Sequence, residues 1–264
     1  MCYFRDKMSL NKNLRTLLLE GEALFQPSVS LDCVIFGFHD NEIKVLLLKS
    51  KSNDLWALPG GFVFKEEHID DAAIRVLKER TGINNIFLQQ FHVFGSPDRS
   101  DWNVHRLSFK KEGIEIGPDH WLSKRFITVG YYALVEFAHV IPTPDASAQN
   151  CSWWDLNEIN ELFMDHKQIL DKALDTLRLQ LNHLPLGYNL LPHKFTMPEL
   201  QKLYETILNK PLDRRNFQRR MMGFGILKRL KETRKGGAHR APFLYSFDMR
   251  KYRKALKMGL YGGW

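Results

Sequence analysis

The chain has 264 residues, a length that fits one large domain or two modest ones. Hydrophobic residues make up 44% of it, enough to build a core, and no apolar run reaches the roughly 18 residues that a membrane-spanning helix needs. The N-terminal stretch lacks the apolar block of a signal peptide, and three cysteines are too few and too scattered for a disulfide framework or a zinc site. These features argue against a membrane protein and a secreted one, and they predict a cytoplasmic protein.

Charge is divided unevenly along the chain. From Pro185 to the end there are 18 of the 38 Lys and Arg residues and 5 of the 30 Asp and Glu residues, a net charge of +13. The rest of the chain holds 20 basic and 25 acidic residues, a net charge of −5. The whole-chain value of +8 therefore hides an acidic front and a strongly basic back, an asymmetry typical of a nucleic-acid-binding end.

The front of the chain alternates between predicted strands and predicted helices. An N-terminal arm, residues 1–27, contains a short helix over Leu14–Leu24. The elements predicted after it are strands over 28–38 and 42–49, a helix that follows Gly61, strands over 86–94, 126–140 and 153–156, and a helix over 165–181. The Pro-containing segment 184–192 predicts a linker, so that the two domains run over 28–184 and 185–264.

One stretch of the front domain carries a signature. Seven residues fall at the spacing of the Nudix box, a loop–helix–loop pattern: Gly61, Glu67, Arg75, Leu77, Glu79, Gly82 and Ile83. The chain thus resembles the Nudix family, which implies an α/β/α sandwich over about residues 28–184. Nudix enzymes hydrolyse nucleoside diphosphates linked to another group, using Mg²⁺ held by box glutamates. This chain has Val76 and Arg80 at two positions where the family has Glu.

The two departures bear directly on catalysis. Positions 76 and 80 are one helical turn apart, so their side chains share a face beside Glu79. Mg²⁺ takes oxygen ligands, and a guanidinium at a ligand position repels the ion and cannot deprotonate. The sequence therefore predicts a scaffold without catalytic residues, metal or cofactor. An alternative stays open: a Nudix pyrophosphohydrolase acting on ADP-ribose-like nucleotides, with an accessory nucleic-acid-binding domain.

The basic back of the chain has the pattern of a winged helix-turn-helix. Thr196 and Glu199 form a capping box that starts one helix, Asp213 caps the next, and two strands follow around a basic, Gly-rich tip. In such domains the second helix enters the DNA major groove and the wing holds phosphates. The residues expected to contact DNA are Arg214, Arg215, Asn216, Gln218, Arg219 and Arg220 on the helix, and Lys235, His239 and Arg240 on the wing. A structural RNA-associated protein is the other interpretation of the same charge.

The two halves together resemble the Nudix-related transcriptional regulators of bacteria, which control NAD metabolism or sugar utilisation. This resemblance implies a homodimer that binds double-stranded operator DNA, with the Nudix fold serving as an effector sensor. Degenerate boxes are common among the sugar-sensing members, so the resemblance favours a pentose or another sugar as effector. The candidate effector-binding residues are Asp32, Lys49, Trp56, Glu67, Arg75, Glu79, Asp98 and Arg99. The alternative effector is ADP-ribose or a phosphorylated metabolite, bound through Lys49, Arg75 and Arg80.

Overall fold

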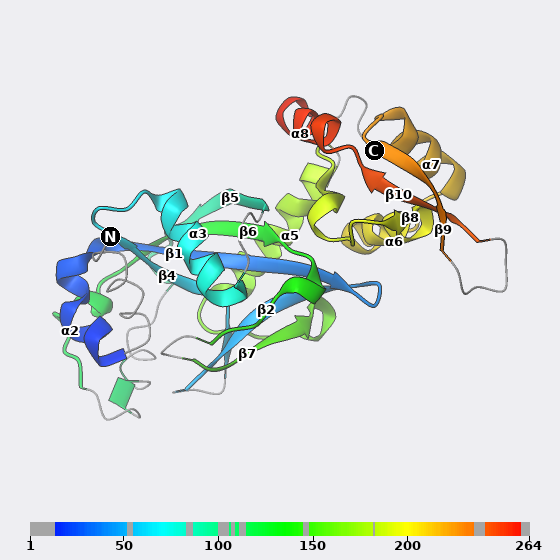
Figure 1. Ribbon diagram of the computed structural model, residues 1–264. Helices are drawn as coiled ribbons and strands as arrows, with labels where there is room; N and C mark the ends of the chain where they lie inside the picture. The colour runs from blue at the N-terminus through cyan, green and yellow to red at the C-terminus, as the bar shows by residue number, and fades with distance from the viewer. Residues whose placement is uncertain are drawn as a thin grey trace.

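The protein has a large domain built on a mixed β-sheet and a smaller helical domain at one end of it (Figure 1). The structure is a computed structural model that describes residues 14–51, 55–82, 87–99, 106, 109–110, 115–144, 148–181, 183–234 and 241–259. In the described chain, no helix is long and apolar enough to cross a membrane.

Strand β1 (Phe25–His39) runs through the middle of the large sheet. The sheet follows the order β3-β2-β1-β6-β5, with β4 added on β1 and β7 added on β2. Strand β6 lies parallel to β1, and the other pairings are antiparallel. The remaining strands are β2 (Glu42–Ser50), β3 (Trp56–Ala57), β4 (Gly60–Phe64), β5 (Phe87–Phe94), β6 (Ile127–Leu134) and β7 (Ala148–Asp155).

Alternation along β1 divides the large domain into two layers of core. Leu31 and Cys33 pack against the box helix α3 (Ile69–Thr81) on one face of the sheet. Val34 and Phe36 pack against helix α5 (His166–Leu181) on the other face. Because strand side chains point alternately to opposite faces, one strand serves both layers. The predicted α/β/α sandwich is confirmed.

The N-terminal part differs from prediction at one boundary. Helix α2 (Leu14–Leu24) lies where it was expected, but β1 begins at Phe25 rather than Ser28, so residues 25–27 belong to the sheet and not to the arm. Phe25 is buried against Phe64 and Trp121, which draws the start of the strand into a small aromatic core. The indole N–H of Trp121 donates to the carbonyl of Leu18 at 3.3 Å, so this part of the long 101–124 segment holds α2.

Two other predicted strands end elsewhere. Strand β6 stops at Leu134 and gives way to the 3₁₀ helix η2 (Phe137–His139), whereas the sequence predicted a strand to Val140. Strand β7 begins at Ala148, earlier than the predicted start at 153, because it pairs with β2 along most of that strand.

The smaller domain is a winged helix, as predicted. Its elements are β8 (Phe195–Thr196), α6 (Met197–Leu208), α7 (Arg214–Gly223), β9 (Leu227–Thr233), β10 (Phe243–Phe247) and α8 (Met249–Met258). The capping box of Thr196 and Glu199 is present, and the Asp213 carboxylate accepts the backbone N–H of Asn216 at 2.9 Å. Helix α8 was not predicted.

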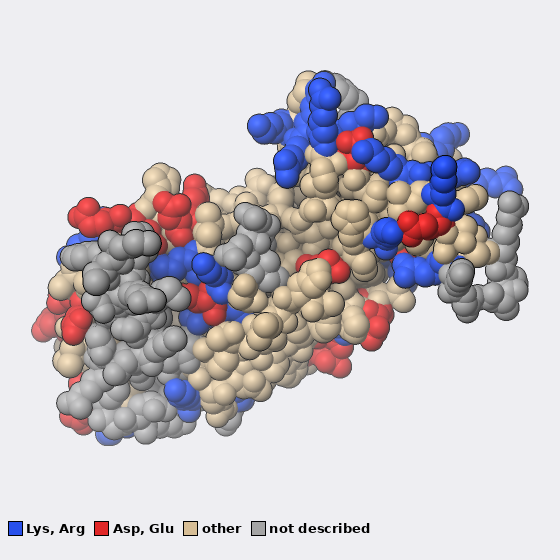
Figure 2. Space-filling model, in the orientation of Figure 1, with Lys and Arg blue, Asp and Glu red and all other residues tan. Residues whose placement is uncertain are grey.

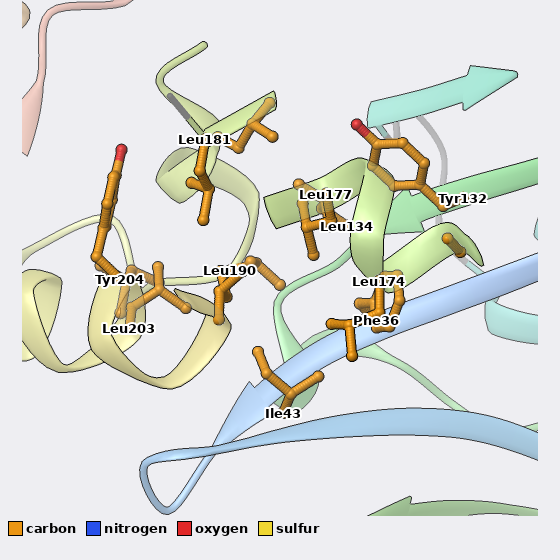
Figure 3. Close-up of a cluster of buried hydrophobic side chains, with 14 of the residues drawn as sticks. Phe36, Ile43, Tyr132, Leu134, Leu174, Leu177, Leu181, Leu190, Leu203 and Tyr204 are labelled. Carbon is orange, nitrogen blue, oxygen red and sulfur yellow. The ribbon is translucent and has the colours of Figure 1, made fainter. Parts of the chain in front are cut away.

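The predicted linker is instead part of the core. Residues 184–192 contain the 3₁₀ helix η4 (Leu186–Asn189), and Leu186, Leu190 and Leu191 are buried. One continuous apolar cluster therefore joins the two domains through α5. Figure 3 shows its centre, with Phe36, Ile43, Tyr132 and Leu134 from the sheet, Leu174, Leu177 and Leu181 from α5, and Leu190, Leu203 and Tyr204 from the winged-helix side. Helix α5 ends before the Pro and Gly residues of this segment, as expected. The segment is not a solvated linker, because burial of its leucines is favourable.

Candidate effector site and DNA-binding surface

The Nudix box is braced by an ion cluster around Arg75. Its Nε and one terminal nitrogen donate to the two oxygens of Glu67, each at 2.8 Å, and the guanidinium also donates to the carbonyl of Phe62 at 2.9 Å. Glu79 lies 3.7 Å from the same guanidinium. Glu67 in turn accepts the backbone N–H of Phe64. Bidentate pairing of this kind fixes geometry, so Glu67 and Arg75 hold the loop to the helix.

The residues present do not fit the Mg²⁺ that the box implies. Val76 is fully buried, and a Cβ added at Gly61 would lie 2.8 Å from its side chain, so this position is filled by packing. Arg80 is only 4% exposed and lies near enough to Cys33 to oppose the rise that burial and Asp32 cause in the pKa of that thiol. A buried cation and an alkyl group replace two acids. Across the described residues, no group of three His, Cys, Asp or Glu side chains is arranged to hold a metal.

A second polar cluster lies on the α5 face of the sheet, at the start of α5. Arg99 is 7% exposed and makes a bidentate pair with Asp165, at 2.9 and 3.0 Å. It also donates to the hydroxyl of Thr128 at 2.6 Å and lies 3.8 Å from Asp32. Buried charges are stable only when they are paired in this way. Sequence reasoning selected Asp32 and Arg99, and the structure brings them together.

His166 completes this cluster. The backbone N–H of Leu58 donates to its Nδ1 at 2.9 Å, which leaves the ring proton on Nε2, 3.9 Å from Asp32. Burial raises the pKa of Asp32, His166 and Arg99 lower it, and Asp165 adds to the rise. Asp32 is thus a buried carboxylate that lies between the side chains of Arg99 and His166.

Lys49 and Trp56 lie on the same face, at the β2–β3 pair. They are register partners, and the Lys49 ammonium lies 5.8 Å from the centre of the Trp56 ring. Trp56 is half-buried and meets Trp154 edge-on, with ring centres 5.0 Å apart. The Lys49 ammonium can pair with a phosphate, and the Trp56 ring can stack on a base. Asp98 is exposed, beside the buried Arg99.

The sheet therefore separates the predicted effector residues into two groups. Gly60 faces Asp32 and Gly61 faces Val76, which places the two clusters on opposite faces of the sheet. Glu67, Arg75 and Glu79 belong with α3, and the residues on the α5 face are Asp32, Lys49, Trp56 and Arg99. Sequence reasoning missed Asp165 and His166, since both were assigned only to a helix start and their partners are far away in the chain.

The second helix of the winged domain, α7, presents a basic outer face. Phe217 and Met221 are buried in the core, as predicted. The six residues of α7 that are predicted to contact DNA lie away from this core: Arg214, Arg215, Asn216, Gln218 and Arg219 are exposed, and Arg220 is half-buried. Arg219 donates to the Asn216 side chain at 3.0 Å, which orients both groups. Lys235, His239 and Arg240 lie outside the described residues. Figure 2 shows Lys and Arg gathered on this domain, while Asp and Glu lie mostly on the other one.

Fold and sites define an α/β domain whose apolar core continues into a basic winged-helix domain. Residues 27–176 match the NUDIX domain, and residues 187–247 match the NrtR DNA-binding winged helix domain. The chain belongs to the NUDIX family and carries an NrtR-type winged helix behind its NUDIX domain.

Particular relatives point in two functional directions. The chain is 28% identical over 233 residues to the ADPR responsive transcriptional repressor NtrR of Acinetobacter baylyi, covering 86% of this chain and 84% of that protein. It matches the crystal structure of Shewanella oneidensis NrtR complexed with a 27mer DNA with a TM-score of 0.70 and 25% identity, covering 89% of this chain and 99% of that one. It is also 29% identical over 147 residues to the ADP-ribose pyrophosphatase of Methanocaldococcus jannaschii, which covers 54% of this chain and 71% of that protein.

Proposed function

We propose that the protein is a transcriptional repressor that binds operator DNA through α7 and the wing, and whose affinity for DNA is set by ADP-ribose bound in the NUDIX domain. The observation that carries the proposal is the continuous core between a domain whose box lacks two acids and a basic winged helix. The repressor and the DNA complex among its relatives support the same assignment. The expected homodimer stays a prediction.

ADP-ribose replaces the predicted sugar as the proposed effector. The names of two relatives refer to it, and none of the relatives described above is a sugar sensor. The α5-face cluster offers matching chemistry: Lys49 for the pyrophosphate, the Trp56 ring for adenine, and Asp32 for ribose hydroxyls. A free sugar lacks the phosphates that would use Lys49.

Helix α5 is the proposed route from effector to DNA. Its start carries Asp165 and His166 in the polar cluster. Three turns further on, Arg178 donates to the carbonyl of Ile207 at 2.9 Å, at the end of α6. The hydroxyl of Thr206, also on α6, shares its proton between the carbonyl of Lys202 at 2.8 Å and the carbonyl of Asn41 in the β1–β2 turn at 3.0 Å. Because Arg178 joins α5 to the end of α6 that leads into α7, a small shift of α5 would move the DNA-reading helix relative to the sheet.

A pyrophosphohydrolase is the second candidate, favoured by the ADP-ribose pyrophosphatase relative and by the retained Glu67 and Glu79. Against it, Val76 and Arg80 are buried at positions that need acids, and Glu67 is engaged by Arg75. Incubating the protein with ADP-ribose and Mg²⁺ or Mn²⁺ distinguishes the two candidates. Release of AMP that Glu79→Gln abolishes would establish the enzyme, whereas intact ADP-ribose supports the sensor.

The proposal is tested by fluorescence anisotropy on the DNA upstream of the protein's own gene. Saturating ADP-ribose should change the dissociation constant for this DNA, typically by about 5- to 150-fold for an allosteric effector. AMP and ribose 5-phosphate, the two halves of the effector, serve as ligand controls. Lys49→Gln should weaken the ADP-ribose response, and Lys172→Gln, an exposed lysine on the outer side of α5, should leave it unchanged. An identical dissociation constant with and without ADP-ribose would refute the proposal.

A further inference from the structure

Helix α8 is a cationic element that lies beyond the residues 187–247 matched to the winged-helix family. It carries Arg250, Lys251, Arg253, Lys254 and Lys257, all exposed, and no acidic residue. Within the described part of the chain, none of these five cations forms an ion pair. Figure 2 shows Lys and Arg gathered at this end of the winged-helix domain and on the neighbouring surface, with uncharged and acidic residues between them.

The charges on α8 form a stripe at helical spacing. Arg250, Arg253, Lys254 and Lys257 follow the i, i+3, i+4, i+7 pattern, which places them on one face. The opposite face is buried through Tyr252, whose ring lies 5.3 Å from that of Tyr188 and 5.1 Å from that of Phe247. Helix α8 thus has one face that packs in the core and one face whose charged residues are all cations.

The exposed side of helix α5 has a different charge pattern. On α5, Lys167 pairs with Asp171 and Arg178 pairs with Asp175, so that opposite charges alternate one turn apart. On α8, like charges stand one turn apart, an arrangement that weakens a helix by itself. A polyanion seated along the stripe removes this repulsion, which water does only in part.

The helix is also fixed relative to the DNA-reading helix. The Asp248 carboxylate accepts the backbone N–H of Lys251 at 3.3 Å and caps α8. The backbone N–H of Asp248 donates at 2.8 Å to the carbonyl of Ile226, which follows α7, and its side chain pairs with Lys228 of β9 at 3.3 Å. Because the start of α8 is bonded to Ile226, between α7 and β9, its cations keep a set position relative to the end of α7.

We propose that the α8 stripe binds the phosphate backbone of duplex DNA flanking the segment read by α7, an inference that rests on the proposed repressor function. The expected contacts are to phosphates, because a row of cations of one sign along a helix complements the evenly charged backbone of duplex DNA. It lengthens the DNA site and adds affinity equally for operator and unrelated DNA. An acidic protein partner is the competing occupant.

The test compares two charge-matched double variants of the full chain. Arg253→Gln/Lys254→Gln removes two stripe cations, and Lys78→Gln/Lys172→Gln removes two exposed helical lysines from the NUDIX domain. Operator binding is measured against salt concentration, where each lost phosphate contact lowers the slope by roughly 0.9. The stripe variant should lower the slope by about 2 per protomer and weaken operator and unrelated DNA by the same factor. The control variant should match the wild-type protein.

Hydroxyl-radical footprinting supplies a second readout, with protection expected to shorten at the flanks and to persist at the centre. A stripe variant with wild-type slope, affinity and footprint would overturn the α8 inference and favour the protein partner. If the wild-type chain itself shows no operator preference, the repressor function fails instead, so the two failures are distinguishable. Circular dichroism and thermal melts of both variants verify that helix content and stability match those of the wild-type protein.

Discussion

At the scale of single residues, the same side-chain types serve different purposes on the two faces of the sheet. Arg75 satisfies a box glutamate and braces a loop, whereas Arg99 neutralises Asp165 at the base of the proposed effector site. Arg80 is buried at a position that needs an acid for metal binding. The replacement of carboxylates by a cation and an alkyl group changes what the box can bind while the fold stays that of the family.

The first prediction concerns the Glu67–Arg75 pair. If the pair is structural, Glu67→Ala and Arg75→Ala should each destabilise the protein by about 2–4 kcal/mol, because each leaves a partly buried charge without its partner. The double variant should cost less than the sum, with a coupling energy of about 1–3 kcal/mol in a urea-denaturation cycle. Additive single effects would show that the two side chains act independently.

The second prediction concerns the pH dependence of Asp32. Burial raises the pKa of Asp32 above its ordinary value of 3.8, so the folded protein holds this proton more tightly than the unfolded chain does. The contribution of Asp32 to the unfolding free energy is therefore largest below pH 3.8. It declines as the pH rises from 3.8 through the raised pKa that Asp32 has in the folded protein. The unfolding free energy of wild type minus that of Asp32→Asn should fall with pH in this window and then level off. A difference that grows with pH would contradict the assignment.

At the scale of elements, helix α5 connects the two sites because its start and end are held by different partners. The start belongs to the polar cluster through Asp165, and the end holds the last turn of α6 through Arg178. Helix α7 is positioned in turn by Glu205 of α6, which accepts the backbone N–H of Leu212 at 2.9 Å across the turn. Each link is a specific hydrogen bond supported by apolar packing.

The third prediction tests the α5 link. Arg178→Ala removes the bond to Ile207 and should leave ADP-ribose and operator affinities within about twofold of wild type, while reducing the effect of one ligand on the other. Asp175→Ala is the matched control, since it removes only the 3.5 Å ion pair of Arg178. Retention of full coupling in Arg178→Ala would exclude this route.

The fourth prediction concerns the recognition helix. Arg215 is exposed on the outer face of α7, and its replacement by Ala should cost about 1–3 kcal/mol in operator binding. The loss should be larger for the operator than for unrelated DNA, because base contacts carry the specificity. Equal losses on both DNAs in a competition assay would assign Arg215 to a phosphate instead.

Sequence patterns predicted the elements whose signals are local. The capping residues Thr196 and Asp213 and the box helix lie where spacing placed them. The joining of Asp32 with Asp165 and His166 was not predictable, because it depends on how β1 meets α5 across the fold. The core role of residues 184–192 was missed for a similar reason, since burial there follows from partners in both domains.

At the scale of the whole molecule, the two domains share one apolar cluster and cannot move as independent bodies joined by a flexible segment. Leu177 of α5 is fully buried in that cluster, and removing such a side chain typically costs about 2–5 kcal/mol. In the proposed function, effector binding therefore acts through small shifts of packed helices rather than through separation of domains. Charge follows the same division, with the cations concentrated on the winged-helix end, which is proposed to bind DNA (Figure 2).

The most direct test of this account is calorimetric titration of ADP-ribose into the protein, alone and bound to its operator duplex. Coupling between two sites is reciprocal, so DNA must change the affinity for ADP-ribose by the same factor by which ADP-ribose changes the affinity for DNA. We expect the two factors by which each ligand changes the affinity for the other to be equal, and ADP-ribose to be intact at the end of the titration. Identical ADP-ribose affinities with and without operator, or conversion of the ligand to AMP and ribose 5-phosphate, would contradict it.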